Sequence, residues 1–261
     1  MARVSTVSIE REEQGKLIDS LAKKHRNAFR KELKRVVFEA MKSYRIVGRI
    51  PSEIFIDHTE RLKKILENAT TDSGKKAGKR QFRLLRRGNK KSIEIKQEEN
   101  EDTEFDFLLG LFALNYALSN SSEISSTTER RTRAAIDQAG AEGLNRDDTT
   151  DFVENKVGKK QSRIRSGIIA LATVASAFNF GTSESSAVYG KANDLKVDKI
   201  WVTRHDELVR ESHREANGQK VDLKDTFIVG GEELRFPADP DGSPGNVINC
   251  RCVMRYETEE I

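Results

Sequence analysis

The sequence predicts an α+β fold, in which an extended, mainly helical N-terminal region precedes a small C-terminal α+β module with a short antiparallel sheet. First, apolar residues recur at helical spacing through the early part of the chain. Second, roughly the last sixty residues hold the only Trp, both Cys and three of the four Pro. Third, 34% of residues are charged and 36% hydrophobic, against about 25% and 45–50% in typical domains. Such a composition suits long helices that each bury one stripe.

We expect three segments along the chain. They are a long amphipathic helix at 1–50, a helical region at 51–195 with a charged stretch at 71–104, and the C-terminal module at 196–261. Gly48 is expected to end the first helix, because glycine readily adopts positive φ. Ser52 is expected to cap a second helix that ends near Glu67.

The first predicted helix, from Ser8 to about Tyr44, carries a narrow apolar stripe on a charged rod. Its members recur at multiples of four positions: Leu17, Leu21, Phe29, Leu33, Val37 and Met41. A stripe of this kind packs against another surface. The sequence leaves open whether that surface belongs to this chain or to a partner on which the helix docks.

A basic block lies within the charged stretch. It contains nine basic residues and no acidic ones: Lys75, Lys76, Lys79, Arg80, Arg83, Arg86, Arg87, Lys90 and Lys91. An acidic run at 94–106 follows directly. The two runs either pair with each other or reach outward as a solvated loop. In the outward case the basic block is a candidate contact for DNA phosphates.

The middle of the chain is predicted to contain two apolar helices. Residues 105–118 are the most apolar part and are expected to form its core. Residues 162–180 are predicted as the last long helix, ending near Gly181 and followed by a linker at 181–194. The apolar run at 167–180 is shorter than the about 20 residues that span a bilayer, so no membrane anchor is expected.

The C-terminal module begins with a predicted strand at Lys199–Thr203, where β-branched and aromatic residues nearly alternate. A helix is expected next, on which Asp206, Arg210 and His213 share one face at spacing i, i+4, i+7. Either Asp206 and Arg210 form a solvated pair worth about 0.2–0.5 kcal/mol, or this face is buried against the cysteines.

A β-hairpin is predicted after this helix. Residues Thr226–Val229 and Glu232–Phe236 are its strands, and Gly230-Gly231 is its turn. A loop rich in proline and glycine follows. The final strand is predicted at Val247–Tyr256.

Cys250 and Cys252 fall on one face of that final strand. Ligand types that zinc accepts are available nearby: His213, Cys250 and Cys252, with His205 or Asp206 as a fourth group. On a regular strand the two thiols would lie about 6–7 Å apart, which is long for one tetrahedral ion, although a bulge would close the gap. The alternative is a buried His213 that is hydrogen-bonded beside two small hydrophobic thiols.

In their order and spacing, these residues resemble the C-terminal module of the phage Mu F-like minor head protein family, also called head morphogenesis proteins. The resemblance covers about residues 160–256 and is dense over the module. It is carried by Trp201, Thr203, Asp206, Arg210, His213, Gly218, Phe227, Gly230, Gly231, Pro237, Asp239, Pro240, Asn249, Cys250, Arg251 and Cys252. All of these residues except Gly218, Pro240 and Arg251 are expected to form the structural core of the module.

The resemblance implies a structural virion protein rather than an enzyme. Its expected role is that of a low-copy component associated with the portal and the head interior, acting in head assembly or DNA delivery. The implied partners are the portal protein or the major capsid protein, with packaged DNA as a further candidate. The expected location is the host cytoplasm during assembly and then the virion.

Two other function classes stay open. A small metal- or thiol-dependent hydrolase acting on nucleic acid would use Cys250 and His213 as a nucleophile and its base. A packaged-DNA-binding protein would use the basic block.

Overall fold

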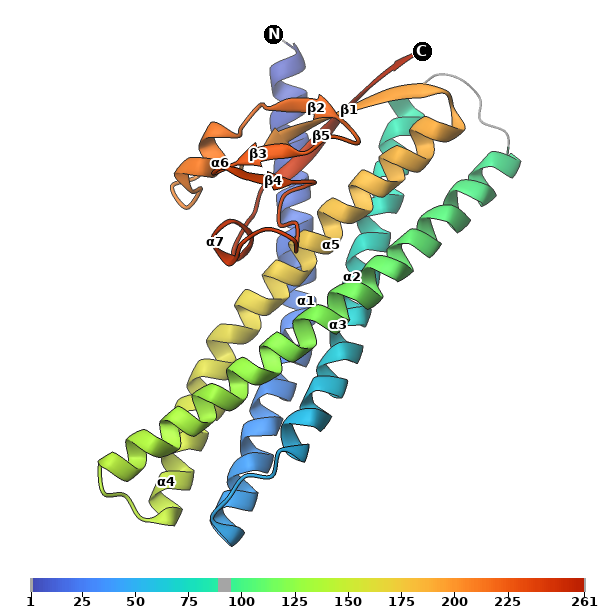
Figure 1. Cartoon of the computed structure of the whole chain (residues 1–261). Helices are drawn as coiled ribbons and strands as arrows, with labels where there is room; N and C mark the ends of the chain where they lie inside the picture. Colours follow the sequence, from blue (N-terminus) through green and yellow to red (C-terminus); the bar gives the residue numbers. More distant parts are fainter. Residues whose placement is uncertain (1, 89–94, 261) are drawn as a thin grey trace. The chain divides into compact units, whose positions relative to one another are not determined.

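Figure 1 shows the computed structural model of the chain, which describes residues 2–88 and 95–260. Side chains are described for 10–87 and 102–260. The elements in chain order are α1 (Ala2–Val47), α2 (Glu53–Gly88), α3 (Ile95–Ala141), α4 (Arg146–Val153), a π-helix (Glu154–Gln161), α5 (Ser162–Ala192), β1 (Leu195–Val202), α6 (Glu211–Glu215), β2 (Lys220–Asp222), β3 (Phe227–Val229), β4 (Glu232–Leu234), α7 (Pro244–Val247) and β5 (Val253–Glu260). This order confirms the predicted α+β class, with long helices first and a short antiparallel sheet at the end.

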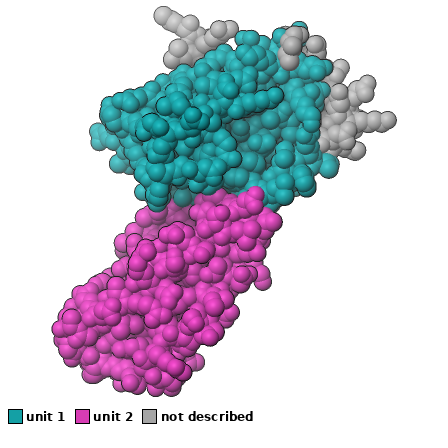
Figure 2. All heavy atoms as spheres, in the orientation of Figure 1, with its two compact units in different colours: residues 1–22, 69–113, 171–261 teal, residues 23–68, 114–170 magenta. Residues whose placement is uncertain are grey.

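The chain forms two compact units, shown in teal and magenta in Figure 2. Unit 1 comprises residues 1–22, 69–113 and 171–261, and unit 2 comprises 23–68 and 114–170. The helices α1, α2, α3 and α5 each contribute one segment to each unit. The units therefore cut across the predicted segments 1–50, 51–195 and 196–261. The C-terminal module shares its unit with the start of α1 and with parts of three later helices.

Two helix boundaries in unit 2 are closed by local hydrogen bonds, and the first of them, at Gly48, was predicted. After α1, the amide of Gly48 donates to the carbonyl of Tyr44 at 2.8 Å, and Gly48 has φ +74°. Before α4, the side-chain oxygen of Asn145 accepts from the amides of Asp147 and Asp148, both at 3.0 Å. These contacts satisfy backbone groups that a helix end leaves without a partner.

Two other predicted helix ends are wrong. The helix α2 does not end near Glu67 but runs through the charged stretch to Gly88. The helix α5 continues to Ala192 through the predicted linker at 181–194. The serines of that linker suggested a loop, but Ser185 is buried in the helix and donates to a carbonyl one turn earlier.

Gly181 lies inside α5 and does not end it. A glycine is required here because α5 packs closely against α2 at this point. A Cβ built at Gly181 would lie 2.4 Å from the carbonyl oxygen of Gly74 in α2. Only glycine leaves room for so close an approach of two backbones. The absence of a side chain, rather than glycine's freedom at positive φ, is what this position requires.

The core of unit 1 lies between the module and the helices. Its three-stranded antiparallel sheet has the order β2-β1-β5, and Trp201 of β1 pairs with Met254 of β5. Trp201 is fully buried in one apolar cluster with Phe227 of β3, Phe178 of α5 and Ile18 of α1. The only tryptophan of the chain therefore reports on the packing of unit 1.

Unit 2 contains a buried charged pair between α1 and α2. Glu32 Oε1 lies 3.0 Å from His58 Nδ1 and 2.6 Å from Arg61 Nε. Burial raises the pKa of Glu32, but the hydrogen bonds from His58 and Arg61 outweigh it, and the pKa lies below its ordinary value. The carboxylate is therefore a satisfied link inside this unit.

The apolar stripe of α1 is used by the chain itself. Its members Leu21, Phe29, Leu33, Val37 and Met41 are at most 3% exposed, and Leu17 is partly buried. They pack on their own units, so they offer no free surface to a partner. The predicted docking role of this stripe is corrected: an apolar periodicity shows that a face is buried, but not whose surface covers it.

Within the described residues, one helical stretch is long and apolar enough to cross a membrane, at Arg146–Ala192. In its most apolar window, 61% is buried inside the structure. Burial of this kind is typical of a core helix.

Gly181→Ala tests the close approach of α5 and α2. The added methyl group would collide with backbone, and overpacking of this kind costs about 1–3 kcal/mol. We expect the free energy of unfolding to fall by that amount in urea titrations followed by Trp201 fluorescence. The matched control is Gly110→Ala in α3, where nothing lies within 4 Å of the new Cβ; it should gain up to about 1 kcal/mol of helix propensity. Equal effects of the two substitutions would contradict the assigned packing.

Candidate functional site

The candidate site lies where the segment before β5 meets α6. The predicted final strand at Val247–Tyr256 is wrong in its first half: β5 begins at Val253, and α7 and an irregular segment precede it. Asn249 has φ +60°, which turns the chain out of any strand geometry. Cys250 and Cys252 therefore lie in a bent segment rather than on a regular strand.

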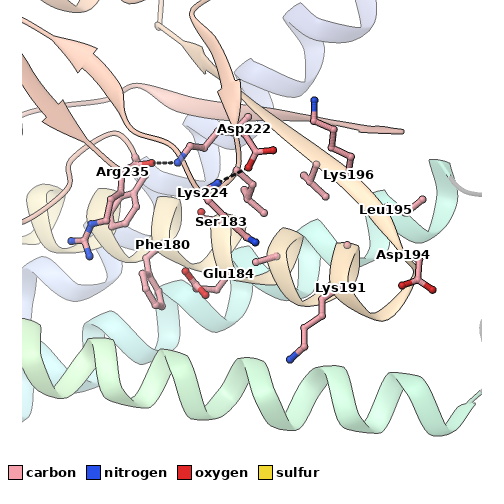
Figure 3. Close-up of a pocket in the computed structure, with 16 residues that line it drawn as sticks. Phe180, Ser183, Glu184, Lys191, Asp194, Leu195, Lys196, Asp222, Lys224 and Arg235 are labelled. Atoms are coloured by element: carbon pink, nitrogen blue, oxygen red, sulfur yellow. Dashed lines mark hydrogen bonds between the residues drawn. The ribbon is translucent and has the colours of Figure 1, made fainter. Parts of the chain in front are cut away.

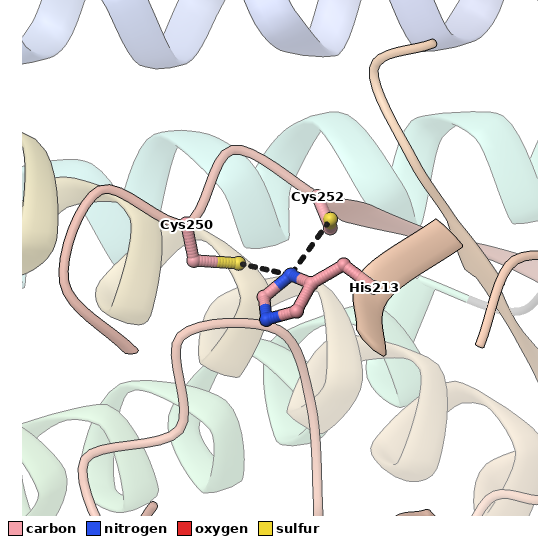
Figure 4. Close-up of side chains that lie close together, drawn as sticks. All are labelled: His213, Cys250 and Cys252. Carbon is pink, nitrogen blue, oxygen red and sulfur yellow. Dashed lines mark hydrogen bonds between the residues drawn. The ribbon is translucent and has the colours of Figure 1, made fainter. Parts of the chain in front are cut away.

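This bend brings both thiols onto one side of His213 (Figure 4). The Nδ1 atom of His213 is 3.4 Å from Cys252 Sγ and 3.7 Å from Cys250 Sγ. All three side chains are at most 2% exposed. Trp201 closes one side of the group, with its ring 5.6 Å from the imidazole and nearly perpendicular to it. The predicted neighbours are thus together, without the 6–7 Å separation of a regular strand.

The two thiols are coupled. Hydrogen bonding with Cys252 is the largest influence on Cys250; together with His213 it outweighs burial and holds the pKa of Cys250 well below its ordinary value. The same contact raises the pKa of Cys252, and burial adds to this effect. The two thiols therefore differ in proton affinity, with the lower pKa at Cys250.

The groups proposed as a fourth ligand lie elsewhere. Among the described residues, the metal-ligand types within reach of one another are His213, Cys250 and Cys252 alone. Asp206 is not on a helix with Arg210, because α6 begins only at Glu211. Of the two alternatives for this face, the solvated Asp206–Arg210 pair is wrong: Asp206 accepts from Arg251 at 2.8 Å, and Arg210 donates to the carbonyl of Ile248. Both contacts tie the start of α6 to the cysteine segment.

Other residues of the predicted core hold the module together. The hairpin is confirmed, with Gly230 and Gly231 at φ +58° and +81° between β3 and β4. Asp239 is 1% exposed and accepts from the backbone and guanidinium of Arg235 at 2.6–2.8 Å. Two residues before Asp239, the carbonyl of Pro237 accepts a hydrogen bond from Asn179 of α5 at 3.0 Å. This bond holds the loop against the helix.

Thr203 follows the last residue of β1 and fixes the end of this strand. Its amide and its hydroxyl both donate to the side-chain oxygen of Asn217, at 2.9 and 3.1 Å. Gly218 follows with φ +85° and donates to the carbonyl of Trp201 at 2.8 Å. This turn returns the chain from α6 to β2.

The sequence-based prediction missed Asn179. This fully buried residue of α5 donates through Nδ2 to the carbonyls of Pro237 and Cys252, at 3.0 and 3.2 Å. It was detectable as the one amide side chain in the apolar run at 167–180. A polar group in such a run needs partners, and here the partners belong to the module.

A second candidate site is a cleft of about 770 Å³ in unit 1, beside α5 and β1 (Figure 3). Burial raises the pKa of Glu184 and lowers that of Lys199 to about 8. Opposite shifts of this kind are found at active sites. However, Lys199 is 2% exposed, its amine donates to the carbonyl of Arg235 at 2.8 Å, and it lies over the ring of Phe227. These contacts make Lys199 a structural part of the module.

The basic block lies on α2 as far as it is described; Lys90 and Lys91 lie outside the described residues. Its members are partly neutralised: Lys75 pairs with Asp106, Lys76 with Asp72 and Arg80 with Glu13, at 2.6–3.0 Å. Arg86 lies over the ring of Phe82. The flexible-loop interpretation of the block is therefore wrong for residues 75–87, which are helical.

Residues 130–255 match a family model described as Phage Mu protein F like protein. The match confirms the resemblance found in the sequence, and it runs from the last part of α3 into β5. The matched residues are therefore similar to a domain of this phage protein family. Searches of curated proteins and of solved structures found no significant match.

Asn179→Ala tests the link between α5 and the module. The substitution leaves two buried carbonyls without their donor, and each such group costs about 1–3 kcal/mol. We expect the free energy of unfolding of unit 1, monitored by Trp201 fluorescence, to fall by at least about 2 kcal/mol. The control is Asn193→Ala, which removes an amide bonded to Tyr189 of the same helix; it should cost clearly less.

The lowered pKa of Lys199 predicts a pH dependence of stability. Between pH 8 and 10.5, the folded chain binds fewer protons at this residue than the unfolded chain, whose lysine keeps a pKa near 10.5. The free energy of unfolding therefore rises with pH in this range. We expect the wild type to gain stability relative to Lys199→Met as pH rises from 8 toward 10.5, measured by urea unfolding. A difference that does not change with pH would contradict this.

Proposed function

We propose that this chain, whose residues 130–255 match the Phage Mu protein F like family model, is a minor head protein. In this proposal it is a low-copy virion component at the portal and the head interior. It acts in head assembly, in DNA delivery, or in both. The observation that carries the proposal is the family match itself, because it includes nearly all of the C-terminal module.

The construction of the module supports a structural role. Its family residues are buried or tied to neighbours: Trp201 in the apolar cluster, Asp239 to Arg235, and Asp206 to Arg251. Trp201 and Asp239 are at most 1% exposed, and Asp206, whose side chain is 36% exposed, is held in an ion pair with Arg251. A rigid knob on long helices is suited to hold a position in an assembly.

We assign the docking role that was first predicted for α1 to an exposed face of α3. In unit 1, the helix α3 exposes two large apolar side chains, Phe107 (66%) and Leu111 (46%). Their spacing of four residues places them on one face of the helix. Exposed apolar stripes mark interaction surfaces. The occupant that fits is an apolar helix of another head protein, the portal or the major capsid protein.

Contact with packaged DNA remains a second candidate. Lys79, Arg83 and Arg87 recur every four residues on α2 and are exposed. Three cations in one row would bind phosphates without sequence preference and with strong salt dependence. The hydrolase alternative has less support, because the cavity beside the thiols measures only about 10 Å³ and has no room for a scissile bond.

The test uses phage particles that carry variants of this chain. In Phe107→Glu/Leu111→Glu, two charges replace apolar contacts, and central contacts of this kind contribute about 2 kcal/mol or more each. We expect the number of copies per particle, measured by quantitative mass spectrometry, to fall about tenfold or more. Particles without the chain should show reduced DNA content or infectivity.

The matched control is Ile164→Glu, which charges another exposed apolar side chain, 61% exposed on α5. It should be incorporated at the wild-type level. Circular dichroism of the purified variants checks that each one folds. Particles that lack the chain but keep wild-type DNA content and infectivity would overturn the proposed function.

A further inference from the structure

We propose that His213, Cys250 and Cys252 hold a structural zinc ion, which locks α6 to the segment before β5. The inference rests on the geometry of the three side chains. It does not depend on the proposed role in the phage head.

The first argument concerns the single lone pair of the imidazole nitrogen. Two sulfur atoms approach Nδ1 of His213, at 3.4 and 3.7 Å, from two different residues (Figure 4). In either tautomer, Nδ1 carries a single lone pair or a single N–H in the ring plane, so it makes one good hydrogen bond and not two. A cation between the three atoms satisfies the nitrogen and both sulfurs at once.

The distances fit the edges of a tetrahedron around zinc. With Zn–N of about 2.05 Å and Zn–S of about 2.3 Å, ideal N···S and S···S edges are about 3.6 and 3.8 Å. The two observed N···S distances lie on either side of the first value, and all three ligand atoms are within 4.8 Å of one another. Small side-chain rotations therefore bring both sulfurs to bonding distance.

The chain is shaped to allow this approach. A regular strand would keep the thiols of Cys250 and Cys252 too far apart for one ion. The positive φ of Asn249 and the late start of β5 bend the segment instead. His213 comes from α6, so the ion would join two elements that are 37 residues apart in the chain.

The choice of zinc follows from the ligands. Two thiolates and one imidazole form a soft donor set with no hard oxygen ligand among the described neighbours, which excludes magnesium and calcium as fitting ions. Among the described residues no fourth protein ligand lies within reach. The small cavity of about 10 Å³ at the same place has room for one water molecule, which would complete the tetrahedron.

The same cavity decides between a structural and a catalytic ion. A catalytic zinc needs an open position that a substrate reaches. Here the ligands are at most 2% exposed and the free space accommodates water alone. The Nε2 atom of His213 has no protein partner in the described residues. The Nε2 atom would lack a protein partner both in a zinc site and in a hydrogen-bonded cluster.

The experiment begins with the full chain purified under reducing conditions without chelator. Elemental analysis should find zinc in equimolar amount with the chain. Removing it with a strong chelator should lower the thermal midpoint of unit 1, followed by Trp201 fluorescence, and added zinc should restore it, since a ligand that binds only the folded state stabilises it. Cobalt in place of zinc should give thiolate charge-transfer absorption, which zinc then abolishes.

The variants Cys250→Ser and Cys252→Ser should lose zinc affinity by more than the roughly 10–100-fold that loss of an outer-shell partner causes. The control is His205→Gln, which changes an exposed histidine outside the site and should keep the metal. The cobalt spectrum of the wild type keeps the test valid if the serine variants fail to fold. The proposal would be overturned in favour of a hydrogen-bonded cluster if the wild type contained no metal and its thermal midpoint changed with neither zinc nor chelator. Zinc retained by the double serine variant would also overturn it.

Discussion

The amide of Asn179 fixes the C-terminal module to the helix on which it is built. It lies in the most apolar part of α5 and donates to the carbonyls of Pro237 and Cys252. One carbonyl belongs to the loop after the hairpin and the other to the cysteine segment. Because an unpaired buried carbonyl costs about 1–3 kcal/mol, both segments are held to the same turn of α5. The position of the thiols beside His213 follows from this constraint.

Local chemistry was enough to predict the elements that carry their own signals. The hairpin at Gly230-Gly231 needs positive φ at both turn positions, and the end of α1 at Gly48 needs it once. Both requirements are visible in neighbouring residues. The Trp201 strand was likewise predictable, since β-branched and aromatic residues nearly alternate there, whereas its partner β5 was predicted to begin at Val247 and begins at Val253.

The errors concern contacts between residues that are distant in the chain. Gly181 was taken as a helix end, but its role depends on Gly74, more than one hundred positions away. One alternative paired Asp206 with Arg210 by helical spacing, although the partner of Asp206 is Arg251. Helical periodicity also cannot distinguish a face covered by the same chain from one covered by a partner. This is why the stripe from Leu17 to Met41 was offered for docking while the outward face of α3 was assigned to the core.

The candidate site was predictable in its members but not in its geometry. His213, Cys250 and Cys252 were selected for their donor atoms, and the resemblance to a known family grouped them. Their distances depend on the bend at Asn249, which no periodic pattern announces. Asn179 escaped notice because a single polar residue in an apolar helix does not reveal its partners.

The order of the two units along the chain has a consequence for biosynthesis. Unit 2 has all its segments once residue 170 has been translated, whereas unit 1 also needs residues 171–261. The buried side chain of Gln14, near the beginning, bonds to the carbonyl of Met254 in β5. The early part of α1 is therefore synthesised well before its partner strand, and its apolar positions are accessible to chaperones until that strand has been made. A nascent chain halted before β5 would be a substrate for cellular quality control rather than a smaller working protein.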